Sequence, residues 1–153
     1  MTKTETVKSA KVLPVFWSGD MSAWNVLLGV SRKSSNIKPI GGTLHPSEGH
    51  LKGALREFAE ETGAVPWVPL EYLGFFQEVT SEPSGLLVGT TMMVHWYLLR
   101  TDEVFVSKMT PQDDLSEFRA AGIDQVSTTL SHASTRVVYK NNIRTQLRKW
   151  YVD

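Results

Sequence analysis

The chain has 153 residues, with 16 basic and 16 acidic side chains, so its formal net charge is zero. This length fits one domain spanning residues 1–153, and the balanced charge argues against the basic surface that binding to extended nucleic acid requires. The chain has no cysteine, which excludes disulfides, thiolate nucleophiles and cysteine-ligated zinc. These features are compatible with a cytoplasmic location, which we expect.

Residues 1–10 are mostly polar and lack the apolar stretch of a signal peptide, so we expect a flexible N-terminal tail. No apolar run approaches the ~18 residues that a membrane span needs. We therefore expect a soluble protein without a membrane partner.

Two apolar segments follow the tail. Val12–Trp17 and Trp24–Val30 are rich in β-branched and aromatic residues and predict two strands, with a turn at Gly19-Asp20 between them. A polar loop over Ser31–Lys38 then leads to Pro39-Ile40-Gly41-Gly42, where adjacent glycines permit a tight backbone conformation.

A helix is predicted over Ser47–Thr62. Ser47 suits the N-cap position, and Gly63 suits the position just past the last turn. Pro66 and Pro69 prevent the helix from continuing. Beyond it, Tyr72–Thr80 and Leu86–Arg100 predict two longer strands, joined by a turn over residues 81–85, and residues 104–106 extend the sheet.

The next segment fits either a short helix over Thr110–Ala121 or a strand over Glu117–Ile123. The last segment, Ser134–Trp150, predicts a helix. The residues that recur there at helical spacing are Tyr139, Ile143, Leu147 and Trp150. Strands with one helix in the middle and one at the end indicate the α/β or α+β class, arranged as a sandwich.

The helix in the middle of the chain carries an unusual charge pattern. An α-helix advances roughly 100° per residue. The stripe that we expect to face the core consists of Leu51, Ala54, Leu55, Phe58 and Thr62. Another face carries the carboxylates of Glu57, Glu60 and Glu61. They fit either a solvated acidic face, which costs little on an exposed helix, or a site for Mg²⁺, which prefers oxygen ligands.

This stretch resembles the signature of the Nudix hydrolase family. The signature is a glycine, five residues, Glu, seven residues, Arg-Glu, two residues, Glu-Glu, one residue, Gly and an aliphatic residue. The matching positions in this chain are Gly42, Glu48, Arg56, Glu57, Glu60, Glu61 and Gly63. The chain departs from the usual pattern at Ala64, where a larger aliphatic residue is more common, and at Ser47, where a glycine is common.

The resemblance implies an α/β (α+β) fold, the Nudix α/β/α sandwich, with a mixed sheet. It also implies that the helix of the signature stretch, or Nudix box (Gly42 to Ala64), packs on this sheet; we call it the box helix. It also implies Mg²⁺ or Mn²⁺ bound by a defined set of ligands. That set consists of the carboxylates of Glu57, Glu60 and Glu61 and the backbone carbonyl of Gly42. Arg56 resembles the family arginine that orients these glutamates, with Glu48 as its partner, although a purely helix-stabilising ion pair is the alternative.

The activity implied is attack of water on a phosphorus of a nucleoside diphosphate linked to another moiety. A carboxylate takes the proton of the water: Glu60 or Glu57 in the box, or Glu117 from a later segment, which is otherwise an ordinary surface acid. The residues that we expect to contact substrate are Arg32, Lys38 and His45. The alternative is a nucleotide-binding module with weak catalysis, and relatives commonly form homodimers.

Overall fold

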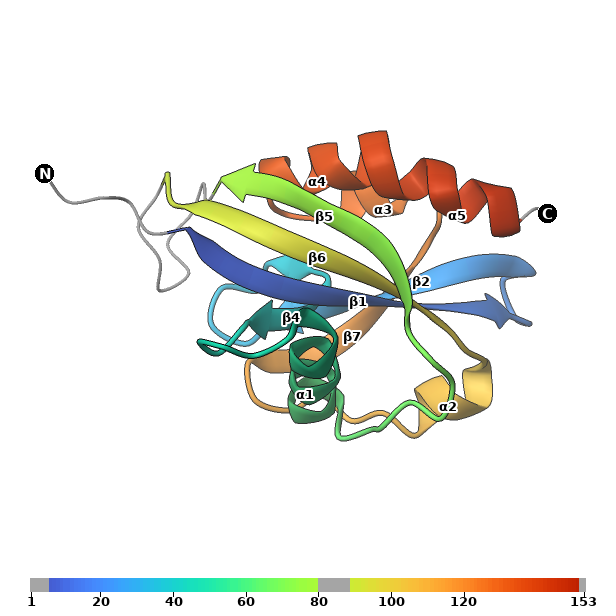
Figure 1. The fold of residues 1–153 in the computed structure, drawn as a ribbon. Coiled ribbons are helices and arrows are strands. Elements are labelled where there is room, and N and C mark those ends of the chain that lie inside the picture. Colours follow the sequence, from blue (N-terminus) through green and yellow to red (C-terminus); the bar gives the residue numbers. More distant parts are fainter. Residues whose placement is uncertain (1–5, 80–88, 152–153) are drawn as a thin grey trace, which may run out of the picture.

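The computed structural model describes residues 6–79 and 89–151, and within them one mixed sheet lies between two layers of helices (Figure 1). The strands are β1 (Val7–Ser18), β2 (Ala23–Ser31), β3 (Ile37–Lys38), β4 (Ile40–Thr43), β5 (Glu71–Val79), β6 (Thr91–Arg100) and β7 (Leu115–Gly122). The helical segments are α1 (His50–Thr62), α2 (Glu103–Ser107), α3 (Val126–Thr129), α4 (Ala133–Val138), the π-helical turn η1 (Tyr139–Ile143) and α5 (Arg144–Trp150). In this part of the chain no helix is long and apolar enough to cross a membrane.

Strand β1 is the centre of the sheet. The strand order is β3-β2-β1-β6-β5, with β4 paired to β1 and β7 paired to β2. One edge of β1 runs parallel to β6, and the other is shared between β2, at its C-terminal half, and β4, at its N-terminal half. The short strand β4 therefore delivers the start of the box segment (Gly42–Ala64) to the middle of the sheet.

Alternation along β1 sorts its side chains between the two helical layers. Ala10, Val12 and Phe16 pack in one apolar cluster with Phe58 of α1. The intervening residues Leu13 and Val15 pack in a second cluster beneath the C-terminal helices. Since a strand presents alternate side chains to opposite faces, this pattern gives the helix–sheet–helix sandwich in Figure 1 that the sequence predicts.

Two of the expected elements differ from the structure. The flexible tail over residues 1–10 is wrong for residues 7–10, because they begin β1 and Ser9 and Ala10 are buried there. Residues 104–106 form helix α2 instead of a strand, because Asp102 caps it by accepting a hydrogen bond from the backbone N–H of Phe105 at 2.9 Å. The strand was the right alternative for the segment that forms β7. The expected turn over residues 81–85 lies outside the described residues.

Helix α1 begins later and is rotated relative to the prediction. Its N-cap is Gly49, whereas Ser47 lies before it with φ of 65°. Gly63 is the C-cap in the left-handed conformation, as expected. The buried residues are Gly53, Ala54, Phe58, Glu61 and Thr62, whereas Leu51 and Leu55 are 47% and 37% exposed. The helix therefore turns the carboxylate of Glu61 toward the sheet, and the two leucines toward solvent.

The predicted C-terminal helix is present as a continuous run through α4, η1 and α5. Tyr139, Ile143 and Leu147 are fully buried against the sheet, as their spacing predicts, but Trp150 is 44% exposed. The Tyr139 hydroxyl donates a hydrogen bond to the carbonyl of Ile123 at 2.7 Å. This contact joins the helix to the chain that follows β7.

Candidate functional site

The site is built on the strand, loop and helix of the box segment. Gly41 has φ of 147°, and a Cβ there would overlap the backbone carbonyl of Ala10. At Gly42 a Cβ would lie 2.5 Å from Oε2 of Glu57. Both glycines therefore allow close approach: Gly41 of β4 to β1, and Gly42 of β4 to a helix carboxylate.

Glu48 and Arg56 form a two-point ion pair. Nε of Arg56 donates to one oxygen of Glu48 at 2.7 Å, and Nη2 donates to the other at 2.9 Å. The Glu48 carboxylate also accepts the backbone N–H of His45 at 3.0 Å. These contacts lower the pKa of Glu48 to about 2, with the bond to Arg56 as the largest cause. Glu48 is therefore a permanent anion at neutral pH, fixed by a two-point contact.

Arg56 also holds the neighbouring box carboxylates. Its Nη1 donates to Glu57 at 2.9 Å and to Glu60 at 3.2 Å, and its Nη2 donates to the carbonyl of Thr43 at 3.2 Å. The predicted role of Arg56 in orienting the box glutamates is consistent with these contacts. Glu57 is largely covered, whereas the side chain of Glu60 is 47% exposed and open to water.

Glu61 occupies a different environment on the same helix. It is 2% exposed, and its Oε2 has no hydrogen-bond partner among the described residues. Burial raises the pKa of Glu61 to about 7, although the positive charges of Lys38 and Lys11 act in the opposite direction. A buried carboxylate oxygen without a donor is costly in a folded protein. It therefore marks a place where a cation or a proton is needed.

Two lysines bring positive charge to this carboxylate. Lys38 of β3 was predicted to contact substrate, and its charge acts on Glu61. Lys11 of β1 was not predicted, although it pairs in register with Gly41, next to the box. Burial lowers the pKa of Lys11, as does the charge of Lys38, whereas the carboxylates of Glu61 and Glu57 raise it. The signal that could have found it is a lysine inside the apolar run of β1.

The residues present suit a hard cation. Glu57, Glu60 and Glu61 supply oxygen ligands only, which Mg²⁺ and Mn²⁺ prefer, and the free buried oxygen of Glu61 requires positive charge. As they stand, no three acidic or histidine side chains in the described ranges are grouped closely enough to hold a metal ion. Arg56 contacts Glu57 through one oxygen and Glu60 through both, so Glu57 keeps a second oxygen for a cation, whereas Glu60 must turn partly from Arg56 to bind one.

Three further predicted residues make no hydrogen bond or ion pair with Glu57, Glu60 or Glu61 within the described ranges. The guanidinium of Arg32 donates to the carbonyls of Asp113 and Leu115, at 3.3 and 3.1 Å, and so anchors the start of β7. His45 is exposed in the loop before α1. The Glu117 carboxylate is exposed on β7 and pairs with Arg119 at 3.4 Å.

A cluster of aromatic side chains covers the start of α1. His50, the first residue of the helix, stacks on His95 with ring centroids 4.1 Å apart and hydrogen-bonds to the Tyr97 hydroxyl. The Tyr72 hydroxyl in turn contacts Nδ1 of His95 at 2.9 Å. His50 lies on the carboxylate-bearing side of α1 by helix geometry, but its ring is engaged with β6. We assign it a structural role.

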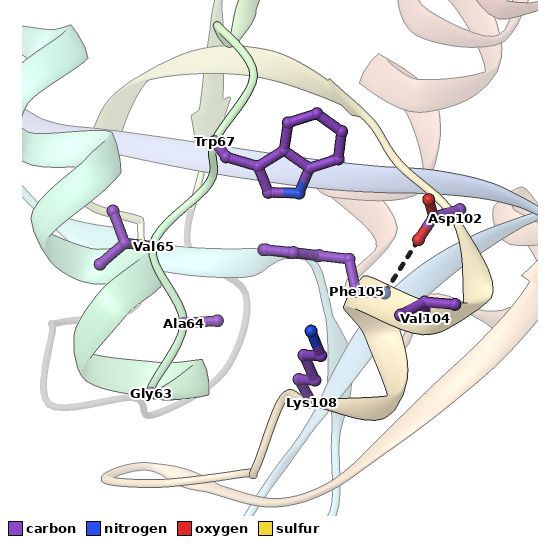
Figure 2. Close-up of a pocket in the computed structure, with 8 residues that line it drawn as sticks. All are labelled: Gly63, Ala64, Val65, Trp67, Asp102, Val104, Phe105 and Lys108. Carbon is purple, nitrogen blue, oxygen red and sulfur yellow. Dashed lines mark hydrogen bonds between the residues drawn. The ribbon is translucent and has the colours of Figure 1, made fainter.

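A separate open pocket of about 500 Å³ lies past the C-terminal end of α1 (Figure 2). Its lining consists of Gly63, Ala64, Val65, Trp67, Asp102, Val104, Phe105 and Lys108. Trp67 is 75% exposed on one side, and Lys108 extends toward Phe105 from the other. None of the predicted site residues lines this pocket, so we place the candidate site at the box carboxylates.

Comparisons with known proteins show the family and the fold of this chain. The NUDIX domain family matches residues 14–141. An Ap4A hydrolase from C. elegans, solved as a binary complex, has a similar fold, with a TM-score of 0.72 and 14% identity over 95% of this chain and 100% of that one. A MutT protein from Methanosarcina mazei Go1 has a TM-score of 0.70 and 18% sequence identity, over 95% of this chain and 99% of that one.

The NUDIX domain of Shewanella oneidensis NrtR, solved with ADP ribose, gives a TM-score of 0.71 and 15% identity over 95% of this chain and 90% of that one. No curated protein matches the chain at a significant level of sequence similarity. The predicted α+β sandwich is thus confirmed by its structural neighbours.

Proposed function

Because the chain belongs to the NUDIX family, as the box segment predicts, we propose that it is a metal-dependent hydrolase that cleaves a diphosphate bond in a nucleoside diphosphate derivative. Members of this family are generally pyrophosphohydrolases of such compounds. The observation that carries the proposal is the arrangement on α1. One arginine orders Glu48, Glu57 and Glu60, while Glu61 keeps a free oxygen in the interior.

Glu57, Glu60 and Glu61, with the backbone carbonyl of Gly42, are the ligands that we assign to Mg²⁺ or Mn²⁺. When bound, the ion would supply Lewis-acid chemistry, polarising phosphoryl oxygens and offsetting negative charge. Arg56 and Glu48 act as positioning residues, because Glu48 holds the Arg56 guanidinium, which in turn contacts Glu57 and Glu60.

The cations of Lys38 and Lys11 are proposed to bind the phosphate oxygens of the substrate. Both act electrostatically on Glu61 from the sheet, so a diphosphate placed next to the carboxylates would meet balancing charge. Arg32 and His45 are weaker candidates, because Arg32 is already engaged with carbonyls of β7 and His45 lies exposed in its loop.

We assign the proton-accepting base to Glu60. Its side chain is the more exposed of the two box candidates, at 47% against 13% for Glu57, so water reaches it directly. A carboxylate that takes a proton from water in the transition state contributes about 100-fold or more to the rate. Glu117 remains the alternative base, as predicted from the sequence.

The test is hydrolysis of a panel of nucleoside diphosphate derivatives with Mg²⁺, comparing the wild type with Glu60→Gln. We expect wild-type turnover that EDTA abolishes, and a loss of about 100-fold or more in kcat in the variant. Glu117→Gln is the matched control, because it removes an exposed carboxylate outside the box, and we expect it to retain activity.

The reverse outcome, with Glu117→Gln inactive and Glu60→Gln active, would move the base to β7. Calorimetric binding of Mg²⁺ and nucleotide without turnover of any compound in the panel would contradict the hydrolase and favour a nucleotide-binding module.

A further inference from the structure

The charges of this neutral chain are unevenly distributed, and the C-terminal helices carry an excess of positive charge. The chain has 16 basic and 16 acidic residues. Residues 125–152, however, include five basic residues and no acidic one. The five are Arg136, Lys140, Arg144, Arg148 and Lys149. The rest of the chain therefore carries a matching excess of negative charge, and the net charge of zero does not describe the surface of these helices.

The fold places most of these cations on one outer layer. Helix α4, the turn η1 and helix α5 form a continuous run that covers the face of the sheet opposite α1 (Figure 1). Three of the five basic side chains are exposed, and Arg144 is half-buried. The exposed ones are Lys140, Arg148 and Lys149. Arg136 is engaged, because its guanidinium donates to the carbonyl of Leu130 at 3.2 Å. The available cations therefore belong to η1 and α5.

The π-helical turn keeps these cations in line. The buried residues of the run recur at a spacing of four: Tyr139, Ile143 and Leu147. In a regular α-helix, four residues overshoot one turn by roughly 40°, whereas a π-helical turn has more residues and reduces this drift. Lys140, Arg144 and Arg148 each directly follow one of the buried residues. They therefore form a row beside the buried stripe, with a spacing of about 6 Å along the helix.

The row is poorly neutralised by neighbouring acids. Arg148 pairs with Asp124 at 2.6 Å, but both side chains are more than half exposed, so this ion pair is weak. Lys140, Arg144 and Lys149 form no ion pair with any residue that the structure describes. The row therefore presents positive charge that an anionic partner can neutralise.

The neutral residues around the row indicate which polyanion it suits. Residues 140–149 expose no large apolar side chain, whereas the centre of a protein–protein interface depends on apolar or aromatic anchors. A helix that binds a membrane inserts its apolar face, and here that face is buried on the sheet. The exposed neutral side chains, Asn141 and Thr145, are instead of the types that bind phosphate oxygens together with arginine and lysine.

An exposed aromatic ring lies at the end of the same helix. Trp150 is the last residue of α5 and is 44% exposed. Proteins that bind single-stranded nucleic acid combine a positively charged track for the backbone with aromatic rings on which unpaired bases stack. The combination of a cationic row with Trp150 therefore favours a single strand over a duplex, whose bases are not free to stack on a side chain.

We propose that the outer face of η1 and α5 binds the phosphate backbone of a single-stranded nucleic acid. The residues that carry this contact are Lys140, Arg144, Arg148 and Lys149. Because contacts to phosphate carry no sequence information, the binding is independent of base sequence. The surface lies on the other side of the sheet from α1, so this inference does not depend on the proposed hydrolase activity.

The test is the fluorescence anisotropy of an oligothymidylate of about 20 nucleotides, which exceeds the length of such sites. The strand has a 5′ hydroxyl and a 3′ label, and EDTA is present, so a metal-dependent site at the box carboxylates does not contribute. On a single strand, log affinity falls with log salt by about 0.7 for each phosphate contacted. Four contacts predict a slope of about −3, or a loss of about 50-fold between 50 and 200 mM salt.

The decisive variant is the triple substitution Lys140→Gln, Arg144→Gln and Lys149→Gln. It removes the three cations without an ion pair and leaves the pair of Arg148 with Asp124 in place. Glutamine suits a helix about as well as lysine or arginine, so we expect the variant to fold, as circular dichroism will verify. Its affinity at 50 mM salt should fall by about 10-fold or more, and its salt slope should approach −1.

The matched control is the triple substitution Lys33→Gln, Lys52→Gln and Lys108→Gln. These three lysines are exposed and lie outside the row, and their loss changes the net charge by the same amount. The control should bind the oligonucleotide as wild type does. An equal loss in the control, or unchanged affinity in the variant of the row, would overturn the proposal.

Two other polyanions complete the experiment. Tighter binding of polyglutamate than of oligothymidylate would assign the surface to an acidic protein segment. Binding to phosphatidylserine vesicles without binding to the oligonucleotide would assign it to a membrane. Either result would overturn the proposal, whereas hydrolysis of nucleoside diphosphate derivatives, or its absence, would leave it unaffected.

Discussion

Glu48 and Glu61 lie near opposite ends of the box segment and have opposite environments. Arg56 and the N–H of His45 hold the pKa of Glu48 at about 2, so it is charged at any physiological pH. Burial brings the pKa of Glu61 to about 7. A glutamate is thus a fixed structural anion at one end and a titrating group at the other, because donors contact the first and burial removes the second from water.

The two glutamates therefore differ in whether they need a ligand. Glu48 has a full set of hydrogen-bond donors and is stable without one. The buried charge of Glu61 destabilises the folded protein unless a proton or a cation neutralises it. Three predictions test this contrast.

The largest effect should come from titrating Glu61 in metal-free protein. Its pKa rises from 4.5 in the unfolded chain to about 7 in the folded chain, so the folded state binds this proton more tightly. The associated stability is fully present below pH 4.5 and is lost as pH rises through 7. We expect the free energy of unfolding in EDTA to fall by at most about 3 kcal/mol over this window, measured by urea denaturation at stepped pH.

Glu61→Gln should remove this part of the pH dependence and be more stable than wild type at neutral pH. The difference between the two proteins separates Glu61 from Glu78, whose pKa is also raised by burial. Parallel pH profiles for wild type and variant would show that Glu61 is not the titrating group. Saturating Mg²⁺ should offset the loss, since a cation replaces the proton.

A smaller effect should follow from removing the contacts of Arg56. Arg56→Ala removes the contacts to Glu48, Glu57 and Glu60 together. Residues that orient metal ligands typically contribute about 10- to 100-fold to metal affinity or activity, so we expect Mg²⁺-dependent kcat/KM to fall by that factor. Arg56→Lys should recover little, because a lysine cannot make the two-point contact.

Lys52→Ala is the control for this experiment, because Lys52 is an exposed cation of the same helix. We expect its kcat/KM to match that of wild type. An equal loss in both variants would show that the overall charge of α1, and not the geometry of Arg56, sets the activity.

The smallest effect concerns the loop that leads into α1. Ser47 has φ of 65°, a conformation that glycine adopts without strain. Ser47→Gly should therefore raise the free energy of unfolding by about 0.5 kcal/mol, after the entropic cost of glycine is subtracted. Ser116→Gly, in the exposed strand β7, should lower it instead. Destabilisation by both changes would contradict this account of the loop.

Spacing predicted the carboxylates of the site, but not which side of α1 would be buried. Glu57, Glu60 and Glu61 share one side because their offsets are fixed by helix geometry. The wheel assigned Leu51 and Leu55 to the core, whereas the structure exposes them and buries Glu61. Close packing of α1 on β4 at the box glycines decides the rotation of the helix. A helical wheel, which considers only the apolar residues of the helix itself, does not include that contact.

The pairing of strands that are distant in the sequence could not be predicted either. Lys11 and Glu78 read as ordinary strand residues until the order of β1, β6 and β5 brings them to one face. Helix α2, in contrast, had a local signal that could have been used, since Asp102 stands at its N-cap. Elements with a local sequence signal could therefore be predicted, whereas residues that come together only through the strand order could not.

The parallel pairing of β1 with β6 also sets the order in which this chain can fold. Val7 pairs with Met92 and Val15 with Arg100, so the central strand lacks its main partner until about two-thirds of the chain has left the ribosome. Helix α1 is complete well before then, with its apolar side uncovered by a finished sheet. Folds dominated by such distant pairings form in milliseconds to seconds, and apolar surface that is exposed during that time favours aggregation.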